Sequence, residues 1–131
     1  MVVSELRKAR PNAHVVSWVR SLGEGDVFLS VVTIGEIERG IRKLADDEFA
    51  QSLTRWLEDL LRFYGDRVLP VTADIARRWG RLSADLGHEG ADLLIAATAA
   101  SHRLTVATRN VRHFAPTGVT VFDPFKASST A

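Results

Sequence analysis

The sequence predicts an α/β fold in which helices cover both faces of a largely parallel sheet. Short runs rich in β-branched residues alternate with amphipathic helices or helix pairs, without a hairpin signal or an internal repeat. The stretch from Ala91 to Ala100 is apolar except for Asp92 and Thr98, which is typical of a helix enclosed by other elements. Buried strands that alternate with such helices indicate an α/β sandwich with right-handed crossovers.

Length and composition indicate one globular domain. The chain has 131 residues, of which 46% are hydrophobic and 25% charged, so we expect a single domain at residues 1–125 and a polar tail at 126–131. We find neither a secretory signal nor an apolar run long enough to span a membrane, and we expect no membrane association. The lack of cysteine fits a cytoplasmic protein.

Charge gives a weaker indication of the binding partner. The net charge of +1 predicts no strong overall attraction to nucleic acid. Local clusters of basic residues are either solvated helix faces or RNA contacts: Arg7, Lys8 and Arg10; Arg39, Arg42 and Lys43; Arg77, Arg78 and Arg81.

The first part of the chain predicts two helical segments and one strand. Residues 4–8 form a helical turn that Pro11 ends, and Asn12 caps a helix that reaches residue 22. The run VFLSVV at residues 27–32 predicts a buried parallel strand, because it is β-branched and bounded by turn residues.

The helix after this strand contains the first candidate site residue, Glu36. Thr33 and Glu36 have the spacing of a capping box, in which the threonine caps the helix and the glutamate bonds back to it. In the functional alternative, Glu36 lies off the apolar stripe of its helix, near the carboxyl end of a strand where α/β proteins place chemistry. The sequence leaves both roles open.

The rest of the chain predicts three helices and three strands. The helices begin near residues 46, 72 and 91, and the strands span residues 68–71, 105–108 and 119–122. Thr72 is suited to cap the second of these helices, and Gly65 ends the first.

Asp92 is the second candidate site residue, in the first turn of the enclosed helix. A carboxylate there must be compensated, and the free N–H groups of the helix start compensate it in part. Asp92 therefore either caps the helix or belongs to a site at the rim of the core. Asn110 follows the strand at 105–108 and converges on the same edge as Glu36 and Asp92. Carboxylate and amide oxygens suit a hard cation, Mg²⁺ or alternatively Mn²⁺.

Motifs along nearly the whole chain resemble those of PIN-domain proteins, in particular VapC-type toxins and their FitB-like group. The resemblance is carried by Ser-Glu-Leu-Arg-Lys near the start, by Thr-x-x-Glu after a strand, and by ADLLIAATA followed by ATRNV. It implies a PIN-like three-layer α/β/α sandwich and an Mg²⁺-dependent ribonuclease that a cognate antitoxin neutralises. It also implies a homodimer.

In this family a quartet of acidic or amide residues holds one or two Mg²⁺ ions. Glu36, Asp92 and Asn110 match its second, third and fourth members, so the resemblance implies that all three are catalytic and that Glu36 and Asp92 bind the metal. The first member is an Asp ending a strand, and we expect both strand and Asp to lie upstream of Met1. His113 stands where many relatives have a further Asp.

Two other functions compete with this one. The absent Asp and the presence of Asn110 instead of Asp suit a catalytically inactive or truncated PIN-like module that binds antitoxin or RNA. His88, Glu89 and Asp92 resemble a zinc-protease motif loosely, since Gly90 interrupts the helical face and Asp92 replaces the second histidine.

Overall fold

The computed structural model describes residues 2–3, 26–108 and 110–123 of the chain. Within these ranges short parallel strands alternate with helices, so the predicted α/β class is confirmed. The two helical segments predicted before residue 23 and the tail at 126–131 lie outside the described residues.

Five short strands are described, in a three-stranded and a two-stranded sheet, and each of their pairings is parallel. Their bounds are β1 (Val2–Val3), β2 (Leu29–Ser30), β3 (Val68–Leu69), β4 (Val106–Ala107) and β5 (Val121–Phe122). β4 lies between β1 and β5, with Val106 in register with Val2 and Val121, while β2 pairs with β3. β1 also contacts β2, so the two-stranded sheet lies beside β1 of the three-stranded one.

β1 corrects one prediction, because the inner strand was expected to lie upstream of Met1. Val2 and Val3 occupy this place instead, in register with Val106 and Ala107 of β4. Two β-branched residues are enough to continue the pleated surface at this position. The expectation of a sheet without its inner strand is therefore wrong. The residue that follows β1 is Ser4, so the chain has no carboxylate at that point of the sequence.

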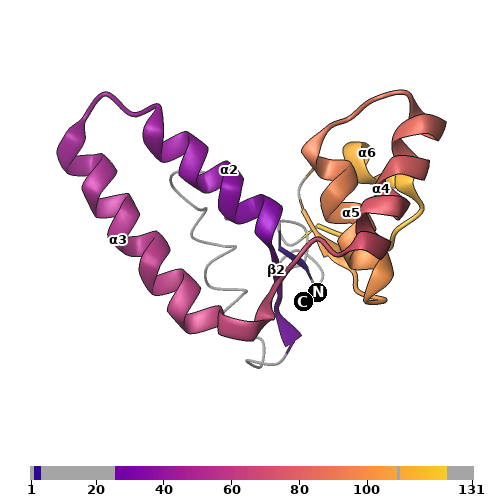
Figure 1. The fold of residues 1–131 in the computed structure, drawn as a ribbon, viewed down its shortest axis with the longest axis horizontal. Coiled ribbons are helices and arrows are strands. Elements are labelled where there is room, and N and C mark those ends of the chain that lie inside the picture. The colour runs from indigo at the N-terminus through magenta and orange to yellow at the C-terminus, as the bar shows by residue number, and fades with distance from the viewer. Residues whose placement is uncertain (1, 4–25, 109, 124–131) are drawn as a thin grey trace.

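Helices lie on both sides of the sheet (Figure 1). Their bounds are α2 (Val31–Arg42), α3 (Asp47–Tyr64), α4 (Ala73–Leu86), α5 (Ala91–Ser101) and α6 (Val111–Phe114), with 3₁₀ turns η3 (Gly65–Arg67) and η4 (Ala115–Thr117). α2 and α3 form a hairpin on one side of β2, and α4, α5 and α6 pack together on the other. No helix among the described residues has the length and apolarity needed to cross a membrane.

Side-chain caps stabilise the starts of two helices, of which the sequence predicted the one at Thr72. The Asp46 carboxylate accepts a hydrogen bond from the Phe49 amide at 3.1 Å, at the start of α3. The Thr72 hydroxyl accepts one from the Ile75 amide at 3.2 Å, at the start of α4. Each bond satisfies an amide that has no partner within the helix. α4 ends at Gly87, whose φ of 76° is a left-handed conformation that glycine adopts without strain.

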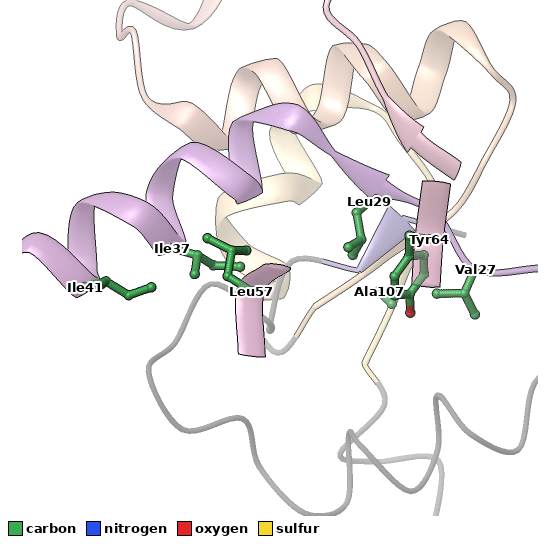
Figure 2. Packing of buried hydrophobic residues seen from close by; sticks show 7 residues of the cluster. All are labelled: Val27, Leu29, Ile37, Ile41, Leu57, Tyr64 and Ala107. Atoms are coloured by element: carbon green, nitrogen blue, oxygen red, sulfur yellow. The ribbon is translucent and has the colours of Figure 1, made fainter. Parts of the chain in front are cut away.

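The buried apolar residues form two clusters. The first lies beneath the α2–α3 hairpin and contains Val27, Leu29, Ile37, Ile41, Leu57, Tyr64 and Ala107 (Figure 2). The second lies beneath α5 and α6 and contains Leu69, Ile95, Ala96, Ala99, Val106 and Phe114. α5 is buried at most of its positions, which confirms the prediction of an enclosed helix.

Tyr64 gives the first cluster a pH dependence that can be measured. Its side chain is 4% exposed, and burial raises the pKa of the Tyr64 phenol above its ordinary value of 10.0. The Arg67 guanidinium, 4.9 Å from the ring centroid, opposes this rise in pKa by favouring the phenolate. The unfolded chain therefore loses this proton at a lower pH than the folded chain does.

We expect the stability of the protein to fall as the pH rises above about 10, because there the unfolded state binds fewer protons than the folded state. Unfolding by urea across this pH range, with and without the substitution Tyr64→Phe, measures the effect. Tyr64 is the chain's one tyrosine, so tyrosinate absorbance reports its titration directly. The same decline with pH in both proteins would show that Tyr64 is not its source.

Candidate active site

The junction between β2 and α2 differs from the sequence prediction. The strand ends at Ser30, so Val31 and Val32 begin the helix instead of ending the strand. The buried Ser30 hydroxyl caps the helix by accepting a hydrogen bond from the Val32 amide at 3.1 Å. A cap at the end of the strand thus outweighs the preference of valine for extended backbone. The prediction that Thr33 caps this helix is wrong.

Glu36 lies in the second turn of α2 as a result. In a capping box the glutamate is the third residue of the helix, a position that Thr33 occupies here, so Glu36 cannot have the capping role. The Glu36 side chain is half-buried. The capping interpretation of Glu36 is therefore wrong, and its role in the site stays a prediction.

Thr33 adds a polar atom beside Glu36, one turn earlier in α2. Its side chain is 0% exposed, and its hydroxyl has no hydrogen-bond partner within the residues that the structure describes. Burying a hydroxyl without a partner costs about 1–3 kcal/mol, so such a group calls for an explanation. A polar ligand next to Glu36 would provide one.

Asp92 is the second residue of α5, and its carboxylate lies 3.2 Å from the Nδ1 atom of His113. The two side chains differ in accessibility, since Asp92 is 15% exposed and His113 is 64% exposed. The N-cap position of α5 belongs to Gly90, which has no side chain to cap with, so the capping interpretation of Asp92 is wrong. The Asp92 carboxylate is instead partly buried and pairs with the exposed His113.

α6 places His113 against Asp92. This four-residue helix follows β4, and its last residue, Phe114, is 0% exposed within the second core cluster. The buried Phe114 ring holds α6 against α5. His113, the preceding residue, then lies at the exposed edge of this contact. The sequence prediction missed both α6 and the contact between His113 and Asp92, because four residues are too few for a periodic pattern.

Asn110 lies between β4 and α6, at the same end of the sheet. Its backbone amide donates a hydrogen bond to the Thr108 hydroxyl at 3.0 Å, and its side chain is half-buried. Asn110 is the N-cap residue of α6, but its side chain makes no capping bond.

The zinc-protease interpretation is wrong. That motif needs two ligands on one face of a helix, but α5 begins at Ala91, after His88. His88 lies in the preceding turn, exposed to solvent, where its Nδ1 atom accepts a hydrogen bond from the Gly90 amide at 3.3 Å.

The predicted metal ligands are brought together only in part. α2 and α6 both contact α5, so the elements that carry Glu36, Asp92 and Asn110 adjoin one another. Yet within the described residues no three His, Cys, Asp or Glu side chains lie close enough to hold a metal ion. Mg²⁺ is commonly held by one or two carboxylates, with water and substrate phosphate completing its shell. The donor chemistry therefore fits Mg²⁺, while the number of protein ligands is small.

Comparison with known proteins agrees with this fold. The model of the PIN domain family matches residues 2–118. Toxin FitB of Neisseria gonorrhoeae is 35% identical over 130 residues, which covers 95% of this chain and 94% of FitB. The VapC ribonuclease Y4jK of Sinorhizobium fredii is 31% identical over 131 residues, covering 95% and 94% of the two chains.

A solved structure extends the agreement to three dimensions. The crystal structure of FitAcB from Neisseria gonorrhoeae superposes with a TM-score of 0.80 at 34% identity, covering 95% of this chain and 99% of that one. The family model matches most of the chain, and relatives above 30% identity cover nearly all of it. The chain is a PIN-domain protein and a homologue of the FitB and VapC toxins.

Proposed function

We propose that this chain is an Mg²⁺-dependent ribonuclease of the VapC toxin type. The observation that carries the proposal is the Asp92 carboxylate, 15% exposed and paired with His113 at the start of an enclosed helix. An acid that is not the cap of its helix and is kept partly open to solvent is suited to bind a cation. The relative named a VapC ribonuclease supports RNA as the substrate.

Asp92 and Glu36 are the residues that would hold the ion, with the Asn110 amide beside them. A bound Mg²⁺ supplies charge stabilisation at the phosphate and activates water for hydrolysis. His113 holds the Asp92 carboxylate in one orientation through the contact of 3.2 Å. The Asn110 side chain, which its helix does not use for capping, is available to orient a phosphate oxygen.

Exposed arginines would bind the RNA backbone. Arg39 and Arg42 on α2 and the three arginines of α4 (Arg77, Arg78 and Arg81) are exposed. Arg42 lies 3.2 Å from Glu38, an exposed pairing that leaves most of its guanidinium surface in solvent. Such residues attract phosphate without reading sequence, and RNA binding should therefore weaken with salt.

Two partners belong to the proposal. A cognate antitoxin is supported by structural neighbours such as FitAB bound to a DNA fragment. We expect this chain and its antitoxin to act in the cytoplasm. A homodimer is the second, and light scattering of the purified chain should give twice the monomer mass. A monomer at micromolar concentration would contradict the dimer.

The proposal is tested by incubating the full chain with a mixed RNA pool. We expect cleavage in Mg²⁺, complete loss of cleavage in EDTA, and recovery when Mg²⁺ is restored in excess. Cleavage that persists in EDTA would rule out the metal-dependent reaction. Bound RNA without cleavage in any divalent ion would favour the inactive binding module, which the small number of gathered ligands also suits.

A further inference from the structure

We propose that the protein has a phosphate-binding pocket at the end of the sheet opposite the candidate active site. The pocket has a volume of about 340 Å³, within the range of about 300–1,000 Å³ that is typical of ligand sites. It lies between the end of α5, the start of β4 and the turn from η4 into β5, and we call it the distal pocket. The described residues that give it a polar lining are Arg103, Thr105, Thr117 and Thr120.

The distal pocket is separated from the candidate active site by the length of α5. Ala100 lines the pocket near the last residue of this helix, about 12 Å along its axis from Asp92. Thr105 and Thr120 directly precede β4 and β5, whereas Asn110 follows β4. A ligand in the distal pocket would leave the candidate active site open, so its binding does not depend on a metal ion at Asp92.

The charge of the distal pocket favours an anion. Arg103 is the one charged residue among the described residues that line it, and its side chain is exposed. No ion pair of Arg103 is found in the described part of the chain. The hydroxyls of Thr105 and Thr120 have no hydrogen-bond partner among the described residues either. A guanidinium and two such hydroxyls are donors that match the oxygen atoms of a phosphate group.

The backbone of Arg103 is strained, which points to a use for its side chain. Its φ of 57° is left-handed, a conformation that glycine adopts without strain and that Gly87 shows at the end of α4. The Arg103 amide donates a hydrogen bond to the Ala100 carbonyl at 3.2 Å. The Leu104 amide donates one to the Ala99 carbonyl at 2.8 Å, which completes a helix ending that usually has glycine at this position. An arginine in place of that glycine costs stability and supplies the positive charge of the distal pocket.

The walls of the distal pocket are held by the core. Leu104 and Val119 both pack against the second core cluster. The Thr117 hydroxyl donates a hydrogen bond to the Phe114 carbonyl and accepts one from the Val119 amide at 3.4 Å. Thr117 thus fixes the turn before β5, while the donors left for a ligand are those of Arg103, Thr105 and Thr120. A pocket held in this way needs little rearrangement to bind a phosphate group.

The phosphate group has two possible sources, RNA and a free nucleotide. Both carry phosphate oxygens that accept hydrogen bonds from a guanidinium. Both also carry a sugar and a base, for which Leu104 and Val119 provide an apolar wall. The chemistry of the distal pocket is the same in either case, and titration with each compound separates them.

The test follows the backbone amide resonances of the full chain by NMR during titration with sodium phosphate at constant ionic strength. We expect shifts at Thr105, Gly118 and Thr120, and Arg103→Gln should weaken binding at least about tenfold, because hydrogen bonds to charged groups are strong. Arg103→Gly should lose binding to the same extent and melt at no lower temperature than the unaltered chain, since glycine relieves the strain. Titrations with AMP and with a short RNA in EDTA then identify the source, which is the compound that shifts these amides at the lower concentration.

The matched control is Arg55→Gln. Arg55 is an exposed arginine of α3, on the other side of β2 from α5, so this variant removes the same charge and should bind phosphate as the unaltered chain does. Asp92→Asn should also leave phosphate binding unchanged, because Asp92 lies at the far end of α5. Equal weakening by Arg103→Gln and Arg55→Gln would show an effect of net charge alone and overturn the inference. Titrations in which phosphate, AMP and RNA all leave the three amides unshifted would overturn it as well.

Discussion

Replacing Asp92 with Asn is expected to lower the rate of RNA cleavage at least about 100-fold, because even residues that only support a metal ligand contribute 10–100-fold to affinity or activity. The metal-free protein should keep its stability. The substitution weakens the pairing of Asp92 with His113, which is 64% exposed, and such solvent-accessible pairs contribute about 0–1 kcal/mol. Cleavage assays and thermal unfolding of the same samples measure the two effects.

Asp74→Asn is the matched control for this substitution. Asp74 is the second residue of α4, as Asp92 is of α5, but its side chain is exposed. Both variants remove the same charge from the same position of a helix, and with it the same small favourable interaction with the helix dipole. A similar decrease of cleavage in both would mean that the charge acts at long range and that Asp92 has no special role.

Phe114→Ala is expected to cost about 3–5 kcal/mol of stability, the usual range for removing a fully buried aromatic ring. Phe114 is 0% exposed and packs with Ile95, Ala96 and Ala99 of α5. A destabilisation of this size would lower the melting temperature by at least about 10 °C in a domain of this length. Because Phe114 anchors α6, the variant should also separate His113 from Asp92 and so bind the metal ion more weakly.

Phe63→Ala removes the same ring from an exposed position. Phe63 is 60% exposed, and its ring meets Tyr64 edge to face at a centroid distance of 5.3 Å. Such a pair contributes about 0.5–1.5 kcal/mol, so this variant should unfold at a clearly higher temperature than Phe114→Ala. Equal destabilisation by the two substitutions would contradict the anchoring role of Phe114.

The features that sequence predicted well are those set by local chemistry. The cap at Thr72 and the end of α3 at Gly65 were readable because each depends on one residue and its own helix. The burial of α5 was readable because its composition leaves no polar face.

The features that sequence predicted poorly depend on contacts between distant segments. The buried hydroxyl of Ser30 decides that Val31 and Val32 begin α2 instead of extending the strand. A β-branched run by itself does not reveal such a cap. β1 was missed because two valines become a strand only through pairing with β4. At the site, Glu36 was identified as an acid near a strand end and Asp92 as an acid in the first turn of a helix, but the pairing of Asp92 with His113 depends on the packing of Phe114.

The alanine-rich interior of α5 bears on motion and on mutational tolerance. Ala96, Ala97 and Ala99 are 0% exposed, so the helix touches its neighbours through methyl groups and backbone. A larger side chain at any of these positions would overpack the core, at a cost of about 1–3 kcal/mol. Segments this buried exchange their amide hydrogens only when the whole domain opens. Asp92 thus belongs to a rigid unit, and few substitutions in the middle of α5 would leave its position unchanged.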